Sequence, residues 1–314
     1  MKVYESRFLI QSISFAVLTY GGRLGLRLGH WLPCFACPYV GSCSGHCYLM
    51  ALQRSQWGFQ IPFAEFISVW GLRALGMFAG FVLLTLVLSK AWCGWICPFG
   101  TLQDWIAFLR RKLGIKELQF SWSLRDRLKP IKYIFLILLI VIPILIANAG
   151  LHSDFGLPFC QICPAKKLMP IFQGNFRYFA VDVTNPITVF MTIVSLILTA
   201  VFFVGMFFKD RFFCLFCPLL AMISFFDKIG FVRLKKKVDA CTSCGNCQRI
   251  CPVDIREVHL EKEKKNVLTQ DCMLCLKCVE SCPQDGVLSF RFLNKTIFSS
   301  SKNYISKCFI KKKR

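Results

Sequence analysis

Charged side chains are scarce in this sequence. They make up 18% of its 314 residues, whereas 55% of the residues are hydrophobic and 32 are phenylalanine. Such a composition is too apolar for an ordinary soluble domain. The sequence also lacks a catalytic nucleophile with a paired base and a glycine-rich phosphate loop, so no such constellation competes with the features described below.

Acidic residues are the rarest charged group, with 17 against 39 Lys and Arg and a formal net charge of +22. Nucleic-acid binding is not supported, because no interleaved aromatic and basic surface and no recognised module accompanies the charge. Much of the basic excess flanks apolar segments, where it sets membrane orientation. The basic C-terminal residues, which end in KKKR, are expected to touch anionic lipid headgroups.

Four apolar stretches approach or reach the roughly 20 residues that a helix needs to span a bilayer core. They are Phe8–Leu28, Phe66–Ser89, Tyr133–Leu151 and Ile187–Phe208. We expect each to form a transmembrane helix, with Arg23 and Arg27 as interfacial anchors near the end of the first. The N-terminus superficially resembles a signal peptide, but it lacks a small-x-small cleavage site and is interpreted as a retained span.

The loops between these stretches predict the orientation. Residues 90–132 carry nine Lys or Arg, and the residues after Phe208 are also rich in them. The other two connecting loops have far fewer. The positive-inside rule therefore places both termini and residues 90–132 in the cytoplasm, with the chain a multi-pass protein of a bacterial or archaeal inner membrane.

Nineteen cysteines carry the functional signal. Eight form two runs, CTSCGNCQRICP from Cys241 and CMLCLKCVESCP from Cys272, each with the spacing C-x2-C-x2-C-x3-C-P. The pair resembles a two-cluster ferredoxin domain, in which the fourth cysteine of each run binds the other cluster. That resemblance implies one 4Fe-4S cluster on Cys241, Cys244, Cys247 and Cys282, and a second on Cys272, Cys275, Cys278 and Cys251. Zinc would not explain a third cysteine and a Cys-Pro in both runs, and a reducing cytoplasm disfavours disulfides.

Eight of the ten cysteines in the apolar part form an internal repeat. The order is apolar stretch, Cys34-x2-Cys37-Pro38, apolar stretch, Cys93-x3-Cys97-Pro98; it recurs with Cys160-x2-Cys163-Pro164 and Cys214-x2-Cys217-Pro218. Two spans and two Cys-Pro pairs, used twice, predict a membrane domain with two-fold pseudo-symmetry.

This symmetry places two pairs on each face of the membrane. The inner pairs, Cys93, Cys97, Cys214 and Cys217, then supply the four thiolates that one cubane needs. The outer pairs, Cys34, Cys37, Cys160 and Cys163, would form a matching site, although an oxidising exterior also permits disulfides there. Proline suits the first turn of a helix, and the preceding cysteine then lies beside helix N–H groups that favour a thiolate. Buried structural cysteine is the alternative for both sets.

Three cysteines fall outside these sets. Cys43 and Cys47, in GSCSGHC, could replace one outer pair as ligands, form their own disulfide, or support another centre with His46. Cys308 in the basic tail has no partner spacing and no expected role.

With these residues assembled, the sequence resembles the polytopic membrane ferredoxins of the NapH and NosR type over roughly residues 60–290. In that family, spans with Cys-Pro motifs on the inner face precede a two-cluster ferredoxin domain. The resemblance implies electron transfer between the quinone pool and a redox partner, as an electron-transfer subunit of a quinol dehydrogenase. The outer cysteine set departs from the family pattern and suggests a route for electrons across the membrane.

Quinone contacts are expected near the outer ends of the spans. His30 and His152 follow outward-going spans at related positions in the two halves, where a proton-accepting group can serve a quinol. Arg73 is a further candidate, as are Glu65 and Asp154. The alternative is that these are interfacial residues without a redox role.

The predicted fold is an all-α membrane domain of four transmembrane helices in residues 1–235, followed by a small α+β ferredoxin-like domain with two 4Fe-4S clusters in residues 236–293 and a basic tail in residues 294–314. The predicted function is iron–sulfur electron transfer with a quinone and with a ferredoxin-like or cytochrome partner. An assembly, metal-reducing or redox-regulatory membrane protein is the alternative.

Overall fold

The computed structural model describes residues 3–26, 28, 47–55, 69–149, 158–181, 183–227 and 229–302. The chain divides into two compact units. The sheet unit contains the chain up to Ser12, Leu84–Ile96 and the chain from Met222, and the helical unit contains Ile13–Leu83 and Cys97–Ala221. Each unit is assembled from segments that are distant in the sequence.

A long helix overlaps each of the four apolar stretches. These helices are α1 (Val3–Tyr20), α3 (Val69–Leu88), α6 (Ile131–Ala149) and α9 (Pro186–Phe208). Helix α1 ends before the predicted Leu28, because the Gly21-Gly22 pair opens a 3-10 turn that Gly25 closes with a φ of 75°. Glycine adopts this left-handed conformation at little cost, so the chain can leave the helix axis there.

Membrane crossing is indicated by length and composition for one described helix. Helix α9 has 23 residues and a mean hydropathy of 2.6 over its most apolar window, whereas the apolar helical stretch Leu75–Leu88 is shorter. The predicted helices are therefore present in the described residues, while four membrane crossings stay a prediction.

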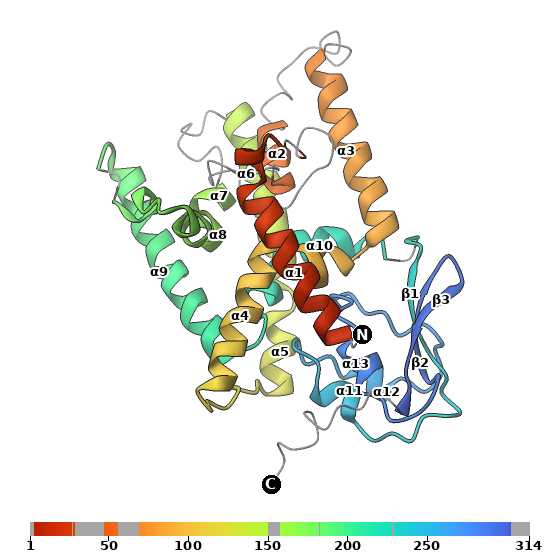
Figure 1. Cartoon of the computed structure of the whole chain (residues 1–314). Coiled ribbons are helices and arrows are strands. Elements are labelled where there is room, and N and C mark those ends of the chain that lie inside the picture. The colour runs from red at the N-terminus through yellow and green to blue at the C-terminus, as the bar shows by residue number, and fades with distance from the viewer. Residues whose placement is uncertain are drawn as a thin grey trace. The chain divides into compact units, whose positions relative to one another are not determined.

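Helix α9 is the centre of packing in the helical unit. Helices α4 (Pro98–Lys112), α7 (Pro158–Ile162) and α8 (Pro164–Leu168) pack against it, as Figure 1 shows. The buried core consists of Phe15, Phe99, Leu168, Met169, Met206 and Phe213. The unit's other α-helices in the described residues are α2 (Tyr48–Ser55) and α5 (Trp122–Leu128), and α10 (Pro218–Ser224) continues from it into the sheet unit.

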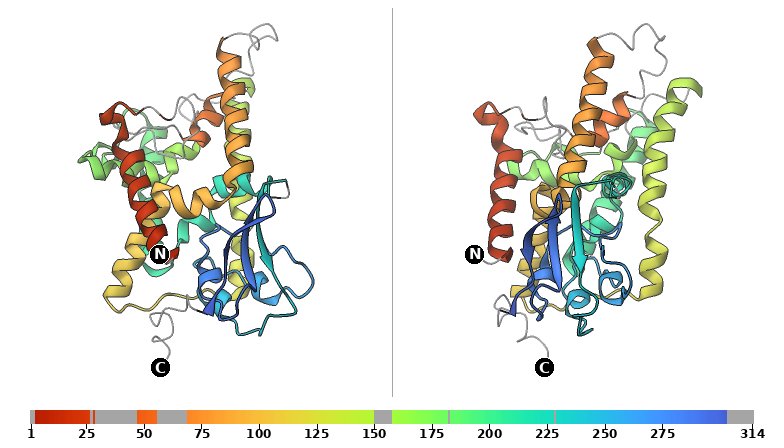
Figure 2. Two further views of the ribbon diagram at one scale, coloured as in Figure 1. Left: turned by 45° about the vertical axis from the view of Figure 1, so that its right-hand side comes forward. Right: turned by 90° about the vertical axis from the view of Figure 1, so that its right-hand side faces the viewer.

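The sheet unit is built on a three-stranded antiparallel sheet. Strands β1 (Val232–Lys236), β2 (Leu288–Phe292) and β3 (Lys295–Ser299) follow one another in the order β1-β2-β3. Figure 2 shows them side by side. Alternate residues of β1 are buried, as expected for a sheet with one face on a core. Its short helices are α11 (Asn246–Arg249), α12 (Glu257–Leu260) and α13 (Lys277–Glu280).

The sheet extends beyond both ends of the segment predicted as a ferredoxin domain. Strand β1 begins at Val232, which pairs with Phe292, and β3 uses residues assigned to the basic tail. Lys295–Ser299 pairs with β2 on the side away from β1, after a tight turn that follows Phe292. A π-helical turn, Trp92–Ile96, also belongs to the sheet unit.

Candidate metal centres

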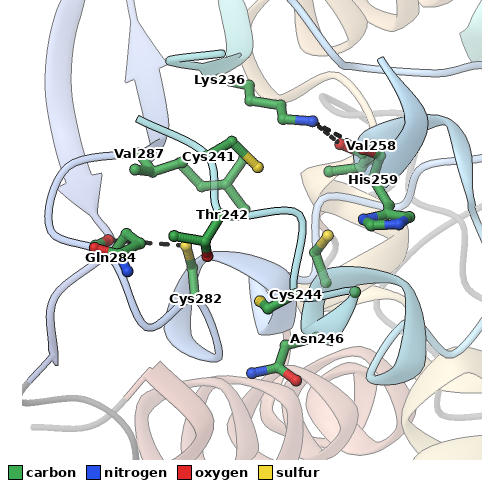
Figure 3. Close-up of a pocket in the computed structure, with 13 residues that line it drawn as sticks. Lys236, Cys241, Thr242, Cys244, Asn246, Val258, His259, Cys282, Gln284 and Val287 are labelled. Carbon is green, nitrogen blue, oxygen red and sulfur yellow. Dashed lines mark hydrogen bonds between the residues drawn. The ribbon is translucent and has the colours of Figure 1, made fainter. Parts of the chain in front are cut away.

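Four cysteines from both ferredoxin-like runs surround one cavity of the sheet unit. This cavity, which we name cavity I, has a volume of about 370 Å³ and is drawn in Figure 3. Its cysteines are Cys241, Cys244, Cys247 and Cys282. Burial raises the pKa of the Cys282 thiol, and Cys244 and Cys241 raise it further. The structure thus places the last cysteine of the second run beside the first run.

Cavity II, of about 430 Å³, lies against the second run. Its cysteines are Cys251, Cys272, Cys275 and Cys278, and Cys247 reaches its wall as well. Burial raises the pKa of the Cys251 thiol, with further contributions from Cys275 and Cys272. The fourth cysteine of each run thus lies beside the first three cysteines of the other run.

The chemistry of both cavities fits a 4Fe-4S cubane, which is held by four thiolates. Within the described residues, no group of three or more His, Cys, Asp or Glu side chains lies close enough together to coordinate a single metal ion. A cubane spreads its four sulfur ligands more widely than a mononuclear zinc site does. The number of clusters and their ligands stay a prediction.

The two runs share an unusual backbone. Ser243 and Leu274 each precede the second cysteine of their run, and both have a φ of 51°. Gly245 and Leu276 each follow that cysteine, with φ values of 73° and 59°. Non-glycine residues rarely adopt this conformation. Its repetition shows that both loops are wound in the same way around their cavities.

Buried lysines stand beside both cavities. Lys236 lines cavity I and is 4% exposed; its ammonium group donates to the carbonyls of Val258, His259 and Glu261 at 3.0, 3.0 and 2.8 Å (Figure 3). Lys90 is fully buried, forms an ion pair with Asp227, and donates to the carbonyl of Thr269 at 2.7 Å. Thr269 lies three residues before Cys272, so Lys90 anchors the entrance of the second run.

The π-turn that carries Cys93 sits directly on the second run. A Cβ on Gly94 would lie 2.3 Å from the carbonyl oxygen of Met273. Trp95 Nε1 donates to the carbonyl of Leu274 at 2.9 Å. Only glycine allows this close approach of two backbones. The sheet unit thereby joins one of the predicted inner cysteines to the ferredoxin-like loops.

The other three predicted inner cysteines gather in the helical unit. Cys97 directly precedes α4 and its Pro98, as the Cys-Pro pattern predicts, and burial raises the pKa of its thiol to about 11. The neighbouring Cys214 raises the pKa of Cys97 further. The pKa of the Cys217 thiol is raised by burial and by the neighbouring Cys214 and Cys97. The backbone N–H groups of Phe99 and Gly100 act in the opposite direction on Cys97. Cys93 belongs to the sheet unit, four residues before Cys97 in the sequence.

Polar residues of α4 hold the Cys214 segment in place. Gln103, which is 1% exposed, donates from Nε2 to Cys214 Sγ at 3.6 Å and accepts the N–H of Phe213 at 3.1 Å. Asp104 Oδ1 accepts a hydrogen bond from Arg211 Nε at 3.0 Å. Burial raises the pKa of the Cys214 thiol, and the Arg211 charge acts in the opposite direction. A second ion pair, Arg110 with Asp210 at 2.6 Å, joins the same two segments.

Two predicted outer cysteines are described. Cys160 lies in α7, and Cys163 directly precedes α8 with Pro164 in its first turn. Gln53 of α2, fully buried, donates to Cys160 Sγ at 3.4 Å. Cys47 directly precedes α2, and burial raises the pKa of its thiol.

Several predicted site residues lie outside the described residues. They are Cys34, Cys37, His30 and His152, together with Cys43, Glu65, Asp154 and Cys308. Arg73 lies in α3, but its side chain is likewise outside the description. The predictions that involve them stay predictions.

The sequence reasoning missed the supporting residues Gln53, Gln103, Arg211 and Lys90. The sequence did contain a pattern for the two glutamines, because Gln53 follows Cys47 and Gln103 follows Cys97 by six positions. The partners of Arg211 and Lys90 lie more than a hundred positions away in the sequence, and nothing in the local pattern pairs them.

The fold and its cysteine groups define a ferredoxin-type iron–sulfur protein. A family model described as a 4Fe-4S binding domain matches residues 70–116 and 191–238, and one described as a 4Fe-4S dicluster domain matches residues 233–283. The chain belongs to the 4Fe-4S ferredoxin family of the NapH and NosR type. No solved structure matches it.

Three relatives illustrate this family. The chain is 31% identical to the uncharacterized protein MJ0750 of Methanocaldococcus jannaschii, over 68% of this chain and 77% of that protein. It is 28% identical to YccM of Escherichia coli, named as a proposed electron transport protein, over 73% of this chain and 59% of YccM. It is 27% identical to the regulatory protein NosR of Pseudomonas aeruginosa, over 59% of this chain and 22% of NosR. YccM and NosR thus extend well beyond the matched region. Together with the family models, these relatives support iron–sulfur electron transfer.

Proposed function

We propose that the chain is a membrane-bound iron–sulfur protein that exchanges electrons between the quinone pool and a redox partner. The observation that carries the proposal is the contact between the π-turn of Cys93 and the loop of cavity II. The Gly94 backbone lies against the Met273 carbonyl, and the Trp95 indole N–H donates to the Leu274 carbonyl. A cluster bound through Cys93 and a cluster bound through Cys275 are thereby linked by touching backbones.

The proposed ligands follow the groups described above. Cavity I takes a 4Fe-4S cluster on Cys241, Cys244, Cys247 and Cys282, and cavity II takes one on Cys251, Cys272, Cys275 and Cys278. A third cluster uses Cys93, Cys97, Cys214 and Cys217, in which Cys93 and Cys97 are four positions apart in the sequence. Each cluster supplies a site that accepts and releases one electron.

Exposure of the cysteines suggests an order for the relay. Cys272 and Cys275 of cavity II are buried, whereas Cys244 of cavity I is exposed. The cluster of cavity II is therefore suited to an internal position between the third cluster and cavity I. The exposed rim of cavity I is suited to a soluble partner, such as a ferredoxin-like protein or a cytochrome.

The membrane part of the proposal rests on apolar surface. In α9, Phe190, Ile197 and Val201 are 64%, 58% and 54% exposed, and in α6, Ile134 and Ile137 are exposed as well. Leaving this much aliphatic and aromatic surface in water is costly, and lipid removes that cost. We propose four spans with both termini in the cytoplasm.

Quinone exchange is testable with the full-length protein, purified anaerobically and placed in lipid nanodiscs. The protein is reduced with dithionite, freed of excess reductant and mixed with menadione. We expect the visible cluster absorbance to recover at a rate that saturates with menadione concentration. The variants His30→Ala, His152→Ala and Arg73→Gln should lower that rate, while oxidation by ferricyanide, which needs no quinone site, should not change.

Two results would contradict parts of this proposal separately. A rate that rises linearly with menadione and is equal in all variants would remove the quinone site but leave the relay. Protein without iron and acid-labile sulfide would remove the iron–sulfur function itself.

The similarity to NosR, a regulatory protein by name, favours a regulatory role as the second candidate function. A regulatory protein changes the activity or level of another redox protein without carrying its electrons. Stoichiometric oxidation of the reduced protein by a partner reductase or cytochrome supports the relay, whereas no such oxidation alongside a changed partner level supports regulation.

A further inference from the structure

The helical unit contains the same arrangement of side chains twice. Residues 97–103 read CPFGTLQ and residues 47–53 read CYLMALQ. In both segments a cysteine directly precedes a helix, α4 after Cys97 and α2 after Cys47, and a buried glutamine follows six positions later.

The two glutamines make the same three hydrogen bonds. Gln103 Nε2 donates to Cys214 Sγ at 3.6 Å and to the carbonyl of Phe99 at 3.4 Å, while its Oε1 accepts the N–H of Phe213 at 3.1 Å.

Gln53 repeats these bonds one for one. Its Nε2 donates to Cys160 Sγ at 3.4 Å and to the carbonyl of Leu49 at 2.9 Å, and its Oε1 accepts the N–H of Phe159 at 3.2 Å. Each glutamine thus bonds the carbonyl four residues before it, a cysteine sulfur, and the phenylalanine before that cysteine.

The cysteines match in their own surroundings as well. The backbone N–H groups two and three residues later are directed at the thiol in both cases: Leu49 and Met50 for Cys47, Phe99 and Gly100 for Cys97. The partner segments also agree, since residues 159–164 read FCQICP and residues 213–218 read FCLFCP. In each of them the second cysteine directly precedes a helix that begins with proline, α8 or α10.

We infer that Cys47, Cys160 and Cys163 bind an iron–sulfur cluster that is the counterpart of the one proposed on Cys97, Cys214 and Cys217. In the sequence, Cys43 precedes Cys47 by four positions, just as Cys93 precedes Cys97, but Cys43 lies outside the described residues. This inference rests on the iron–sulfur function proposed above.

The inference changes the predicted outer set. The inner pair, Cys93 and Cys97, has the spacing C-x3-C, and a glutamine follows Cys97 by six positions. Cys47 shares both features, since Cys43 precedes it by four positions and Gln53 follows it by six. Cys37 shares neither, because Cys34 precedes it by three positions and no glutamine follows six positions later. The structural repeat therefore assigns Cys47, in place of Cys37, to the outer cluster.

Single-cysteine variants of the full-length protein test the assignment, by iron and sulfide content after anaerobic purification. Cys47→Ser should lose about four irons, the content of one cubane, and Cys37→Ser should lose none. Cys97→Ser is the matched control, because it should remove the same amount of iron from the other site. Loss of iron from Cys37→Ser but not from Cys47→Ser would overturn the inference, and so would wild-type protein in which Cys47 is recovered as a disulfide.

The glutamines provide a second test that does not depend on losing a cluster. An N–H directed at a cluster ligand stabilises the reduced state, so its removal lowers the reduction potential. Gln53→Leu should keep the full iron content and shift one cluster midpoint downward, and Gln103→Leu should shift a different one. Unchanged midpoints in Gln53→Leu would overturn the inference, while retained ferredoxin clusters would show that the proposed function still stands.

Discussion

Replacing Gly94 with alanine tests the contact between the π-turn and cavity II. The new Cβ would meet the Met273 carbonyl oxygen at 2.3 Å and the Cys275 nitrogen at 3.3 Å, and real Cβ contacts essentially never fall below 3.0 Å. One of the two backbones must therefore move by at least about 0.7 Å, a form of overpacking.

Neither backbone can move without breaking other contacts. The Gly94 carbonyl is held by Arg7 Nε at 2.9 Å and by Gln11 Nε2 at 3.0 Å. On the other side, Leu274 and Leu276 already hold the loop in left-handed conformations. We therefore expect Gly94→Ala to lower the free energy of unfolding of the sheet unit by about 1–3 kcal/mol, the usual cost of overpacking.

The measurement is an anaerobic urea titration that follows the visible absorbance of the clusters. Gly76→Ala is the matched control, since it also adds one methyl group within a helix but meets nothing within 4 Å; it should be neutral or stabilise by about 0.5–1 kcal/mol. Electron transfer to the ferredoxin clusters should also slow in Gly94→Ala. A midpoint for Gly94→Ala equal to that of Gly76→Ala would refute the argument.

Two further predictions concern charge. Lys90→Met leaves the Asp227 carboxylate in a mostly buried position without its lysine. The same titration should therefore show a free energy of unfolding that is lower by about 3–5 kcal/mol, and the double variant with Asp227→Leu should recover most of that loss. A loss below about 0.5 kcal/mol would contradict the role of the pair. In iron-free protein, burial keeps the pKa of Cys97 at about 11, so its thiolate is rare at neutral pH. Its alkylation by iodoacetamide should therefore rise about tenfold per pH unit between pH 7 and 10. Alkylation that levels off above about pH 9 would show an ordinary thiol.

The sequence predicted the elements that depend on local pattern. Apolar runs predicted the helices later found as α3, α6 and α9 to within a few residues, because a long run of such side chains has no stable alternative to a helix. Cys-Pro predicted that Cys97 and Cys163 precede helices, because proline fits the first helical turn.

What the sequence could not predict depends on pairing across long separations. Nothing near Lys90 indicates Asp227, and nothing near Arg211 indicates Asp104. The pairing of Gln53 with Cys160 shows the same limit, although the repeated C-x5-Q spacing was visible in the sequence. The spacing alone does not predict which groups the glutamine contacts, because a buried glutamine can form hydrogen bonds with many different partners. Only the structure shows that both glutamines make the same hydrogen bonds.

The division of the sheet unit among three segments has a consequence for biogenesis. Its parts are the first residues of the chain, Leu84–Ile96 and the chain from Met222. During synthesis the first two parts emerge long before the third, so the cavities cannot close until nearly the whole chain has left the ribosome. If the proposed cluster binds Cys272 and its neighbours, its insertion is expected to be a late step. A fragment limited to residues 236–293 would lack Gly94, Trp95 and Lys90, and should take up iron poorly even with all eight of its cysteines intact.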